Sequence, residues 1–512
     1  MKAFLLHESG DFDLQQPLPP NEESLRQDLE LDVLLETMGG GDQFIRNVSA
    51  VALLAGTSRM VDPLAIRYRQ ATIADCIRQP GLVHELYDLT IEALKAKSSV
   101  FFPGFSRSSP DMILYRGLEV LDKFVPLLKA LRSFAEEHDE QFASPAFRRL
   151  FAMLETELDE SYFALVEEHL RELRFPHGAL ISAELGRGNA GIHYVLRRRR
   201  EPTWRERLSL RGGDGFVFRI ADRDEAGFRA LEALRGRGIN TSSNALAQSV
   251  DHIVHFWMML RAELGFCIGC LNLHAQLRRR DVAVSFPTPL SEDQLRLSAS
   301  GLRDVPLALT LPTPAMGNDI AADNKRLVMV TGANQGGKST FVRSVAVAQL
   351  MMQAGMFVAA EEFSANTVSG IFTHYRREED ETMESGRLDE ELRRMSVIAD
   401  QIRPGGLLIC NESFSSTNES EGSEIARQVV SAMIDSDVKV LFVTHQYDLA
   451  RGFFESRTRD ALFLRAERKP GGERTFRLGE GEPLPTSHGE DSYARVFGHP
   501  PKRVPAGQVE VA

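Results

Sequence analysis

The sequence has few cysteines and lacks long uninterrupted hydrophobic runs. Four cysteines in 512 residues are too few for a disulfide framework, which excludes the class of small cross-linked secreted domains. No run of apolar residues reaches the length of about eighteen that a membrane span needs, and the first residues turn acidic too early for a secretory signal. These absences favour a cytoplasmic protein that has no membrane partner.

The chain also lacks an excess of positive charge. It holds 72 acidic residues against 60 lysines and arginines, for a net charge of −12. This balance argues against indiscriminate coating of nucleic acid, although a local basic site is still allowed, because such contacts depend on the field near the phosphates. A chain of 512 residues is too long for one hydrophobic core, so we expect several domains.

The hydrophobic pattern changes along the chain. It has a helical period over residues 22–174. Over 178–240 follow three short strand-like segments separated by glycine turns, "GALISAEL", "GIHYVLRR" and "GFVFRIAD", and then a short helix. One long helix is expected from Ser243 to Arg280, and apolar runs suited to buried strands alternate with helices after Asp281. The sequence predicts a multidomain α and α/β fold: a helical domain, a small strand-rich α+β insert, a long returning helix, an α/β domain with a mainly parallel sheet, and a C-terminal segment. The expected boundaries are 1–177, 178–240, 241–281, 282–470 and 471–512.

A glycine-rich motif, "TGANQGGKST", follows the apolar run "RLVMV". It fits G-x-x-x-x-G-K-[ST] from Gly332 to Ser339, and a helical stretch comes next. The glycines let backbone amides face phosphates, Lys338 would reach the β- and γ-phosphates of ATP, and the Ser339 hydroxyl would bind Mg²⁺. An ordinary glycine turn is the alternative interpretation. The residues expected to hold the nucleotide here are Gly332, Ala333, Asn334, Gln335, Gly336, Gly337, Lys338, Ser339 and Thr340.

Polar residues follow the next two apolar runs. In "LLICNESFSSTNESEG" the run ends in Asn411 and Glu412, and "VKVLFVTH" ends in His445. Glu412 is placed to orient and activate a water for attack on the γ-phosphate. Asn411 stands where a metal-supporting acid is usual, so it offers Mg²⁺ an amide oxygen without charge. His445 is a candidate for sensing the γ-phosphate or holding the water; a capping Glu412 and a structural His445 are the alternatives.

Two further stretches leave two interpretations open. Ser385 precedes the helical stretch "RLDEELRRMSVIADQI", where its hydroxyl could bind phosphate or simply cap the helix. "YVLRRRREPTWRERLSLR" holds seven arginines and two glutamates, with Tyr194 and Trp204 between them. Such a loop suits contact with duplex or single-stranded nucleic acid, whereas solvated charge or subunit pairing is the alternative. The candidate DNA-binding residues are Arg197, Arg198, Arg199, Arg200, Arg205 and Arg207.

The motifs, in this order, resemble the ATPase domain of the MutS family, the mismatch-repair branch of the ABC-type P-loop ATPases. The resemblance is carried by "GNDIAADNKRLVMVTGANQGGKSTFVRS", "LMMQAGMFVAAEEF", "SGRLDEEL", "LLICNESFSSTNESEGSEIA" and "VLFVTH". It is dense over residues 300–460. Upstream, "DPLAIRYRQATIADCI" is similar to the start of the family's helical lever domain, and downstream "TSHGEDSYARVFG" is similar to its closing segment.

The resemblance implies a homodimer with two composite ATP sites. Ser385 and the loop from Ser415 to Gly422 of one subunit would complete the site around the other subunit's phosphate loop. It supports Glu412 as the hydrolytic base and His445 as a switch residue. Asn411 departs from the aspartate that is usual in the family, which bears on metal affinity and turnover.

Two parts of the family are not expected here. Lever-like helices begin near residue 22, which leaves no room for the mismatch-reading domain, and no room is left for the Smr nuclease tail. The letters "FAE" at 134–136 match the mismatch-reading motif but lie within a helical stretch. "FCIGCLNLH" places Cys267, Cys270 and His274 on one side of the long helix, where buried packing is the better interpretation than zinc because a fourth ligand is not evident.

Two functional hypotheses follow. The first is a MutS-like ATPase, without mismatch recognition of its own, which couples ATP binding and hydrolysis to binding of duplex, branched or single-stranded DNA in repair or recombination. The second is a slowly hydrolysing, ATP-gated interaction protein that acts on a protein partner instead of DNA.

Overall fold

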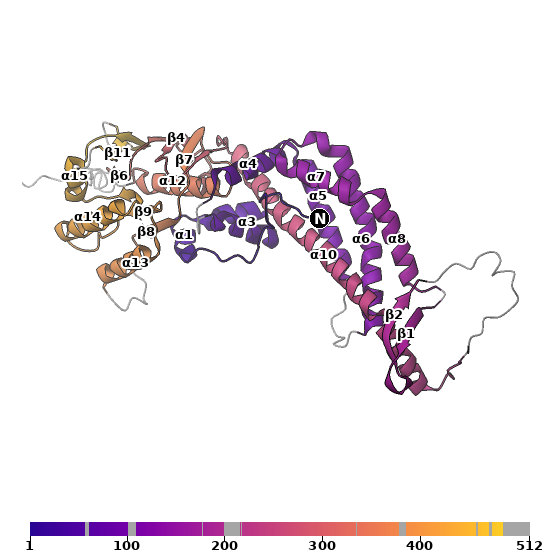
Figure 1. Cartoon of the computed structure of the whole chain (residues 1–512). Coiled ribbons are helices and arrows are strands. Elements are labelled where there is room, and N and C mark those ends of the chain that lie inside the picture. Colours follow the sequence, from indigo (N-terminus) through magenta and orange to yellow (C-terminus); the bar gives the residue numbers. More distant parts are fainter. Residues whose placement is uncertain are drawn as a thin grey trace, which may run out of the picture. The chain divides into compact units, whose positions relative to one another are not determined.

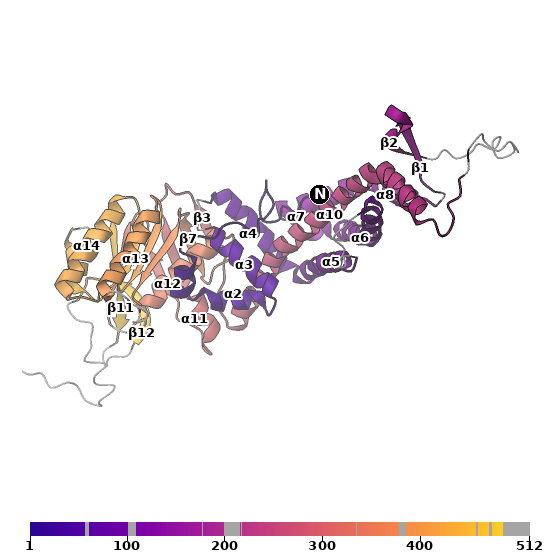
Figure 2. The same cartoon turned by 90° about the horizontal axis from the view of Figure 1, so that it is seen from below.

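The computed structural model describes residues 1–56, 61–100, 109–176, 178–198, 216, 218–333, 335–377, 386–456, 459–469 and 474–484. The chain divides into two compact units. The first consists of Met1–Phe4, Gly81–Ala143 and Phe147–Leu264, and the second of Leu5–Pro80, Ser144–Ala146 and Gly265–Ala512. Helices dominate the first unit and mixed sheets with helices form the second, so the expected multidomain α and α/β organisation is confirmed (Figures 1 and 2).

The first unit is built from long helices and one hairpin. Its elements are α5 (Pro80–Ser98), α6 (Pro110–His138), α7 (Pro145–Glu157), α8 (Glu160–Leu173), β1 (Leu180–Leu185), β2 (Gly191–Arg197) and the first part of α10 (Glu225–Arg279). Figure 1 shows α6 and α8 side by side, and Lys129 Nζ lies 2.7 Å from Glu167 Oε1 between them. Phe134 of α6 packs edge-on against Phe151 of α7, so buried aromatic rings hold these helices together.

Helix α10 is longer than the sequence predicts. It begins at Glu225 and not at Ser243, so it takes in residues that the pattern assigned to the strand-rich insert. Glycines in this stretch disfavour a helix by propensity. In the structure Gly238 faces β1, where an added Cβ would lie only 2.5 Å from Cδ1 of Ile181. Glycine therefore allows close packing of the hairpin on α10, and this packing outweighs the propensity.

The insert contains fewer strands than expected among its described residues. β1 and β2 pair antiparallel, with Leu180 opposite Arg197, and confirm two of the three expected strands. Of the third, "GFVFRIAD", the described residues 216 and 218–222 are not in a strand.

One part of α10 has the hydrophobicity of a membrane span. Its most apolar window of 18 residues has a mean hydropathy of 1.3, and the helix is long enough to cross a bilayer. Within the protein 78% of that window is buried. Packing therefore accounts for the hydrophobic composition of this helix.

The second unit combines N-terminal helices with two sheets. Its helices are α1 (Glu22–Asp28), α2 (Leu31–Gly39), α3 (Gln43–Ala55), α4 (Pro63–Arg78), the end of α10, α11 (Val305–Thr310), α12 (Lys338–Gln353), α13 (Arg387–Gln401), α14 (Glu419–Asp435) and α15 (Tyr447–Ser456). Its strands are β3 (Thr288–Leu290), β4 (Leu297–Leu302), β5 (Asn318–Ala321), β6 (Leu327–Thr331), β7 (Glu362–Asn366), β8 (Ile371–Tyr375), β9 (Leu407–Asn411), β10 (Lys439–Val443), β11 (Ala461–Arg468) and β12 (Arg474–Glu480).

The larger sheet has six strands in the order β12-β11-β6-β10-β9-β8. All neighbours are parallel except the β11–β12 hairpin, so the mainly parallel sheet is observed. The predicted strands "LVMV", "LLIC" and "VKVLFV" are β6, β9 and β10. β12 lies beyond residue 470, the expected end of this domain, yet it belongs to the same sheet because it pairs with β11.

Helices cover both faces of this sheet, which explains its uninterrupted apolar runs. Every residue of β6 and β10 is buried. On one face, side chains such as Met329 and Phe442 pack against α13, α14 and α15 in a single hydrophobic cluster. Helix α12 contacts β9 and β10 as well, and its residues from Phe341 to Gln353 are almost all buried. A strand buried on both faces has no polar alternation.

A smaller sheet, which the sequence pattern did not reveal, has the order β3-β7-β4-β5. β3 and β7 are parallel, and the other pairs are antiparallel. Buried Lys439 at the start of β10 ties the two sheets together, because its Nζ donates to Asn366 Oδ1 of β7 at 2.9 Å and to the Arg296 carbonyl at 3.1 Å. Its burial lowers the pKa of Lys439 to about 8.

The C-terminal end of α12 is held by buried hydrogen bonds to the N-terminal helices. Gln353, fully buried, donates from Nε2 to the carbonyl of Gly56 at 2.6 Å and accepts from the Val368 amide at 2.7 Å. The carbonyl of Gln353 also accepts from Nη1 of Arg69 at 3.4 Å. A cation near the last carbonyls of a helix is favourable because it complements the helix dipole.

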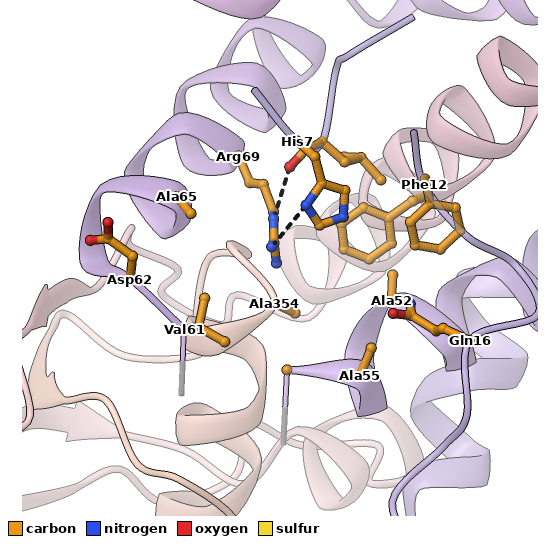
Figure 3. A pocket seen from close by; sticks show the side chains of 13 residues that line it. His7, Phe12, Gln16, Ala52, Ala55, Val61, Asp62, Ala65, Arg69 and Ala354 are labelled. Carbon is orange, nitrogen blue, oxygen red and sulfur yellow. Dashed lines mark hydrogen bonds between the residues drawn. The ribbon is translucent and has the colours of Figure 1, made fainter. Parts of the chain in front are cut away.

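A cavity of about 240 Å³ lies beside this junction (Figure 3). Arg69 enters it from α4, and its Nε donates to the Leu6 carbonyl at 2.9 Å while Nη2 lies 3.5 Å from His7 Nδ1. Phe12 and alanines of α3 and α4 line other walls. Because Arg69 is bonded to backbone carbonyls of the fold, we assign it to anchoring the N-terminal segment against α12.

We expect Gln353→Met to destabilise the protein by about 2–4 kcal/mol, because methionine keeps the volume but leaves the Gly56 carbonyl and the Val368 amide buried without this partner. Urea unfolding of the full chain should show a lower midpoint. Gln428→Met is the matched control, since Gln428 is exposed on α14, where its Nε2 donates to Glu424 Oε1 at 2.9 Å. Equal midpoints for the two variants would contradict this account of the α12 junction.

Candidate nucleotide-binding site

The candidate site is formed where four parallel strands end at the same edge of the larger sheet. Backbone hydrogen bonds align these ends: the Thr444 amide donates to the Val330 carbonyl at 3.1 Å, the Glu412 amide to the Val443 carbonyl at 2.9 Å, and the Arg376 amide to the Asn411 carbonyl at 3.0 Å. The residues that follow β6, β9, β10 and β8 therefore meet at one place. Crevices at the carboxyl ends of parallel strands are where ligands commonly bind in α/β sheets.

The glycine-rich motif forms the loop between β6 and α12, as its spacing predicts. Gly332 has φ +110° and Gly337 has φ +88°, in the left-handed region that glycine adopts at little cost. Close approach also demands glycine at position 332, since an added Cβ would lie 2.9 Å from the Ala466 amide nitrogen. α12 begins at Lys338, so its free amides and the positive end of its dipole face the loop.

Lys338 is folded back onto its own loop. Its Nζ donates to the carbonyls of Gly332 and Ala333, both at 3.0 Å, and the residue is only 5% exposed. Burial lowers the pKa of Lys338 to about 8, an effect that the nearby Glu412 carboxylate opposes. The lysine is thus a cation held by two neutral carbonyls that a stronger anionic partner could replace.

Ser339 and Asn411 are brought together, although 72 positions separate them in sequence. The Ser339 hydroxyl donates to Asn411 Oδ1 at 2.8 Å. Ser339 lies in the first turn of α12 and Asn411 ends β9. The pair presents two neutral oxygens at the mouth of the phosphate loop.

Glu412 and His445 form a close pair across the ends of β9 and β10. His445 Nε2 lies 2.6 Å from Glu412 Oε1. This hydrogen bond lowers the pKa of the Glu412 carboxyl, with help from the charges of Lys338 and Arg376 and against the effect of burial. Glu412 therefore stays ionised at neutral pH, which is the state that accepts a proton.

The loop that carries Glu412 has an unusual backbone conformation, which is held by contacts with β8. Glu412 has φ +57° and the fully buried Phe414 has φ +60°, a region that bulky residues avoid. Phe414 stacks on the ring of His374 in β8, and His374 Nδ1 lies 2.7 Å from Ser413 Oγ. Burial lowers the pKa of His374 to about 4, so the ring is neutral. These contacts fix the direction of the Glu412 side chain.

These residues surround a cavity of about 410 Å³. Most of the lining residues are predicted by the sequence motifs, but Arg376, which follows β8, is not. The only signal was a basic residue after the short β-like run "IFTHY", and the polar letters of that run hide the strand. The lining residues are Gln335, Gly336, Gly337, Lys338, Ser339, Thr340, Arg376, Glu412 and His445.

Other expected site residues are placed differently or lie outside the described residues. Asn334 and Ser385 are outside them, and the N-cap position of α13 is taken by Gly386. All four cysteines, including Cys267 and Cys270, are buried free thiols. Their burial agrees with the expected packing of Cys267 and Cys270. Within the described ranges no group of three or more His, Cys, Asp or Glu side chains could hold a metal.

Of the six arginines predicted to contact DNA, two can be placed. Arg197 ends β2 and its Nε donates to Ser182 Oγ at 2.9 Å. Arg198 is exposed but pairs with Glu168 and with Glu172, the latter at 2.8 Å, so its charge is offset locally. The remaining four, Arg199, Arg200, Arg205 and Arg207, lie outside the described residues.

Comparison with known proteins matches both halves of the chain. The family model "MutS2 N-terminal domain" matches residues 61–280, and "MutS domain V" matches residues 328–477. The second match contains the phosphate loop, Glu412 and His445. The first covers α4 through α10.

Curated relatives are similar over part of their length. A DNA mismatch repair protein MutS of Chloroflexus aurantiacus is 35% identical over 145 residues, which cover 27% of this chain and 15% of that protein. A DNA mismatch repair protein MutS of Thermus aquaticus is 30% identical over 179 residues, or 35% of this chain and 22% of that protein. MutS protein homolog 4 of Mus musculus is 29% identical over 154 residues, which cover 30% of this chain and 15% of that protein.

The matched part therefore spans less than a quarter of the length of each of these relatives. The two family models nevertheless cover, in order, the helical part and the site-bearing sheet of this chain. On these matches and on the site motifs, the chain belongs to the MutS family.

Proposed function

We propose that this protein is a MutS-like ATPase that dimerises around two composite ATP sites and couples ATP binding and hydrolysis to DNA binding in repair or recombination. The observation that carries the proposal is the convergence of Lys338, Glu412 and His445 on one cavity at the ends of β6, β9 and β10. The cavity combines a loop suited to phosphates with a carboxylate suited to activating water. A structural scaffold alone would not require this combination.

Triphosphate binding would use the loop amides, the start of α12 and Lys338. In the free protein Lys338 Nζ bonds to two loop carbonyls, and phosphate oxygens would replace them because a charged acceptor forms the stronger hydrogen bond. The same exchange moves the cation toward the β- and γ-phosphates. The partner subunit would close the site with Ser385 and the segment from Ser415 to Gly422. This segment runs into the first turn of α14, and its residues Asn418, Glu419 and Ser420 are exposed.

The residues present fit a Mg²⁺ ion that arrives with the nucleotide. The Ser339 hydroxyl and the Asn411 amide oxygen adjoin each other, and Mg²⁺ at nucleotides commonly takes few protein ligands beside phosphate oxygens and waters. When bound, the ion would neutralise charge on the phosphates. Because neither ligand is charged, the chain itself would support the metal weakly.

Hydrolysis would depend on Glu412 as base. Its carboxylate is ionised, bonded to His445 and held by the strained loop that Phe414 anchors. A water beside the γ-phosphate could give its proton to Glu412, and His445 would hold the carboxylate in place. Weak metal support by Asn411 then predicts slow turnover.

We propose further that mismatches are not read through the "FAE" letters at 134–136. Phe134 lies in α6, is 4% exposed and packs on Phe151, so its ring is committed to the helical core. Location in the cytoplasm is part of the same proposal and is supported by the four free thiols.

The first test separates binding from hydrolysis. We expect Lys338→Ala to lose nucleotide binding and nucleotide-dependent pairing, and Glu412→Gln to bind ATP but to release phosphate about 100-fold more slowly than the parent or worse. Glu424→Gln, an exposed carboxylate on α14, is the matched control and should behave as the parent. Steady-state phosphate release and equilibrium dialysis measure both effects.

A parent rate equal to that of Glu412→Gln would contradict the enzyme and favour the second candidate, an ATP-gated interaction protein that acts on a protein partner. The observation in favour of that candidate is Asn411, which removes a charge from the metal site. In the enzyme, Asn411→Asp should raise the rate of phosphate release, because it restores an acid beside Ser339.

A second test uses the lowered pKa of Lys338. With a pKa of about 8 the amine is largely neutral at pH 8.5, and triphosphate would restore its charge, so binding should take up on the order of half a proton. Titration calorimetry at pH 8.5 in two buffers of different ionisation enthalpy measures this uptake. Lys338→Arg, which stays protonated, should abolish it. Identical heats in both buffers for the parent would contradict the proposed role.

A third test addresses DNA. Joint replacement of Arg199, Arg200, Arg205 and Arg207 by glutamine should weaken DNA binding about tenfold or more at low salt and reduce its salt dependence. Arg198→Gln is the matched control, because Glu168 and Glu172 already offset its charge. Gel shifts with duplex, branched and single-stranded DNA, with and without ATP, measure this. No binding of the parent to any of them would remove DNA from the proposal.

A further inference from the structure

The cavity at the phosphate loop holds a second permanent cation, Arg376, whose role the proposed function leaves open. Arg376 follows β8, which pairs in parallel with β9 so that Tyr375 lies opposite Asn411. Its amide donates to the Asn411 carbonyl at 3.0 Å, and its side chain lines the same cavity as Lys338. The arginine therefore stands beside Asn411 and Glu412, on the wall formed by the edge strand of the sheet.

The charges of this cavity differ from those of a site built around a metal ion. Its lining carries Lys338 and Arg376 as cations and Glu412 as the carboxylate. Asn411, which accepts the hydrogen bond of the lining residue Ser339, is neutral. With two acids and one lysine, a site would repel the phosphates unless a divalent ion intervened. Here the cations outnumber the carboxylate, and the field of the lining itself favours a polyanion.

An arginine can neutralise part of the phosphate charge that a divalent ion otherwise neutralises. Its guanidinium stays charged and presents several donors in a plane, so it can bind two phosphate oxygens at once. Lys338 approaches the phosphates from the loop, and Arg376 would approach from the end of β8. Between them the two cations would neutralise charge that Mg²⁺ otherwise neutralises.

We propose that Arg376 is a phosphate-binding residue that allows this protein to bind nucleoside triphosphate without a divalent metal ion. The inference rests on the proposed function, because it concerns the same cavity and the same nucleotide. It adds that the protein binds the metal-free form of the triphosphate and that Arg376 makes this binding possible. Mg²⁺ would then matter more for hydrolysis than for binding.

The neighbouring Arg377 provides a matched control. It has the same charge one position further along the chain, but its Nη2 donates to Ser24 Oγ of α1 at 3.3 Å, and it is not among the residues that line the cavity. Arg376→Gln and Arg377→Gln therefore remove the same group from two sides of one strand end. Arg376→Lys keeps the charge but loses the planar donor set.

The experiment measures ATP binding to the full chain by titration calorimetry, in excess Mg²⁺ and again in excess EDTA. For the parent we expect the two dissociation constants to lie within about tenfold of each other. Arg376→Gln should weaken binding in EDTA by about tenfold or more and in Mg²⁺ by less, Arg376→Lys should recover part of the loss, and Arg377→Gln should match the parent. Asn411→Asp should also weaken binding in EDTA, because it adds a negative charge beside the phosphates.

The inference is overturned if the parent binds ATP only with Mg²⁺, or if Arg376→Gln binds ATP in EDTA as the parent does. Either result leaves the proposed ATPase intact. Absence of ATP binding in both conditions would instead contradict the proposed function itself. Melting curves of all variants establish that a loss of binding is not a loss of folding.

Discussion

Parallel pairing of β8, β9, β10 and β6 is the constraint on which the site depends. The chain enters the candidate site at the C-terminal end of each of these strands. The amides of Thr444, Glu412 and Arg376 donate to carbonyls at the end of the neighbouring strand and so hold these ends at one edge of the sheet. A shift of one strand by a single residue would turn its side chains to the opposite face. Every residue of β6 and β10 is buried, so such a shift would exchange the side chains that are packed on the two faces of the sheet. Close packing opposes this exchange and thereby sets the geometry of the polar groups at the sheet edge.

Within the same cavity, the pKa values of two neighbouring charged groups are shifted by different causes. The hydrogen bond from His445 lowers the pKa of Glu412, and burial lowers the pKa of Lys338, although the two side chains line one space. Asn411 contributes a hydrogen bond to Ser339 and no charge. The neutral oxygen beside Ser339 and the nearest ionised carboxylate therefore belong to two successive residues, Asn411 and Glu412.

Sequence patterns predicted the parts of the fold that are governed by local chemistry. Continuous apolar runs identified β6, β9 and β10, and glycine spacing identified the phosphate loop, because burial on both faces and positive φ each demand particular residues. The sequence pattern did not predict β8, because Thr373 and His374 are polar; both are nevertheless buried by tertiary contacts. The predicted start of α10 was wrong for the opposite reason: glycines near its beginning disfavour a helix locally, and the close contact that requires glycine at position 238 is with Ile181 of β1, which local sequence does not reveal. Arg376 could not be predicted as a site residue, because its place in the cavity depends on β8.

Helix α12 has a fixed attachment at each end. Its first turn belongs to the phosphate loop, and its last residue, Gln353, is hydrogen-bonded through both its side chain and its carbonyl to Gly56, Val368 and Arg69. A helix of 16 residues is stiff over its length of about 24 Å. If a bound nucleotide tilts the first turn of α12, the last turn must move as well. Helices α3 and α4, which are hydrogen-bonded to Gln353 through Gly56 and Arg69, must then move with α12, or these buried hydrogen bonds must break.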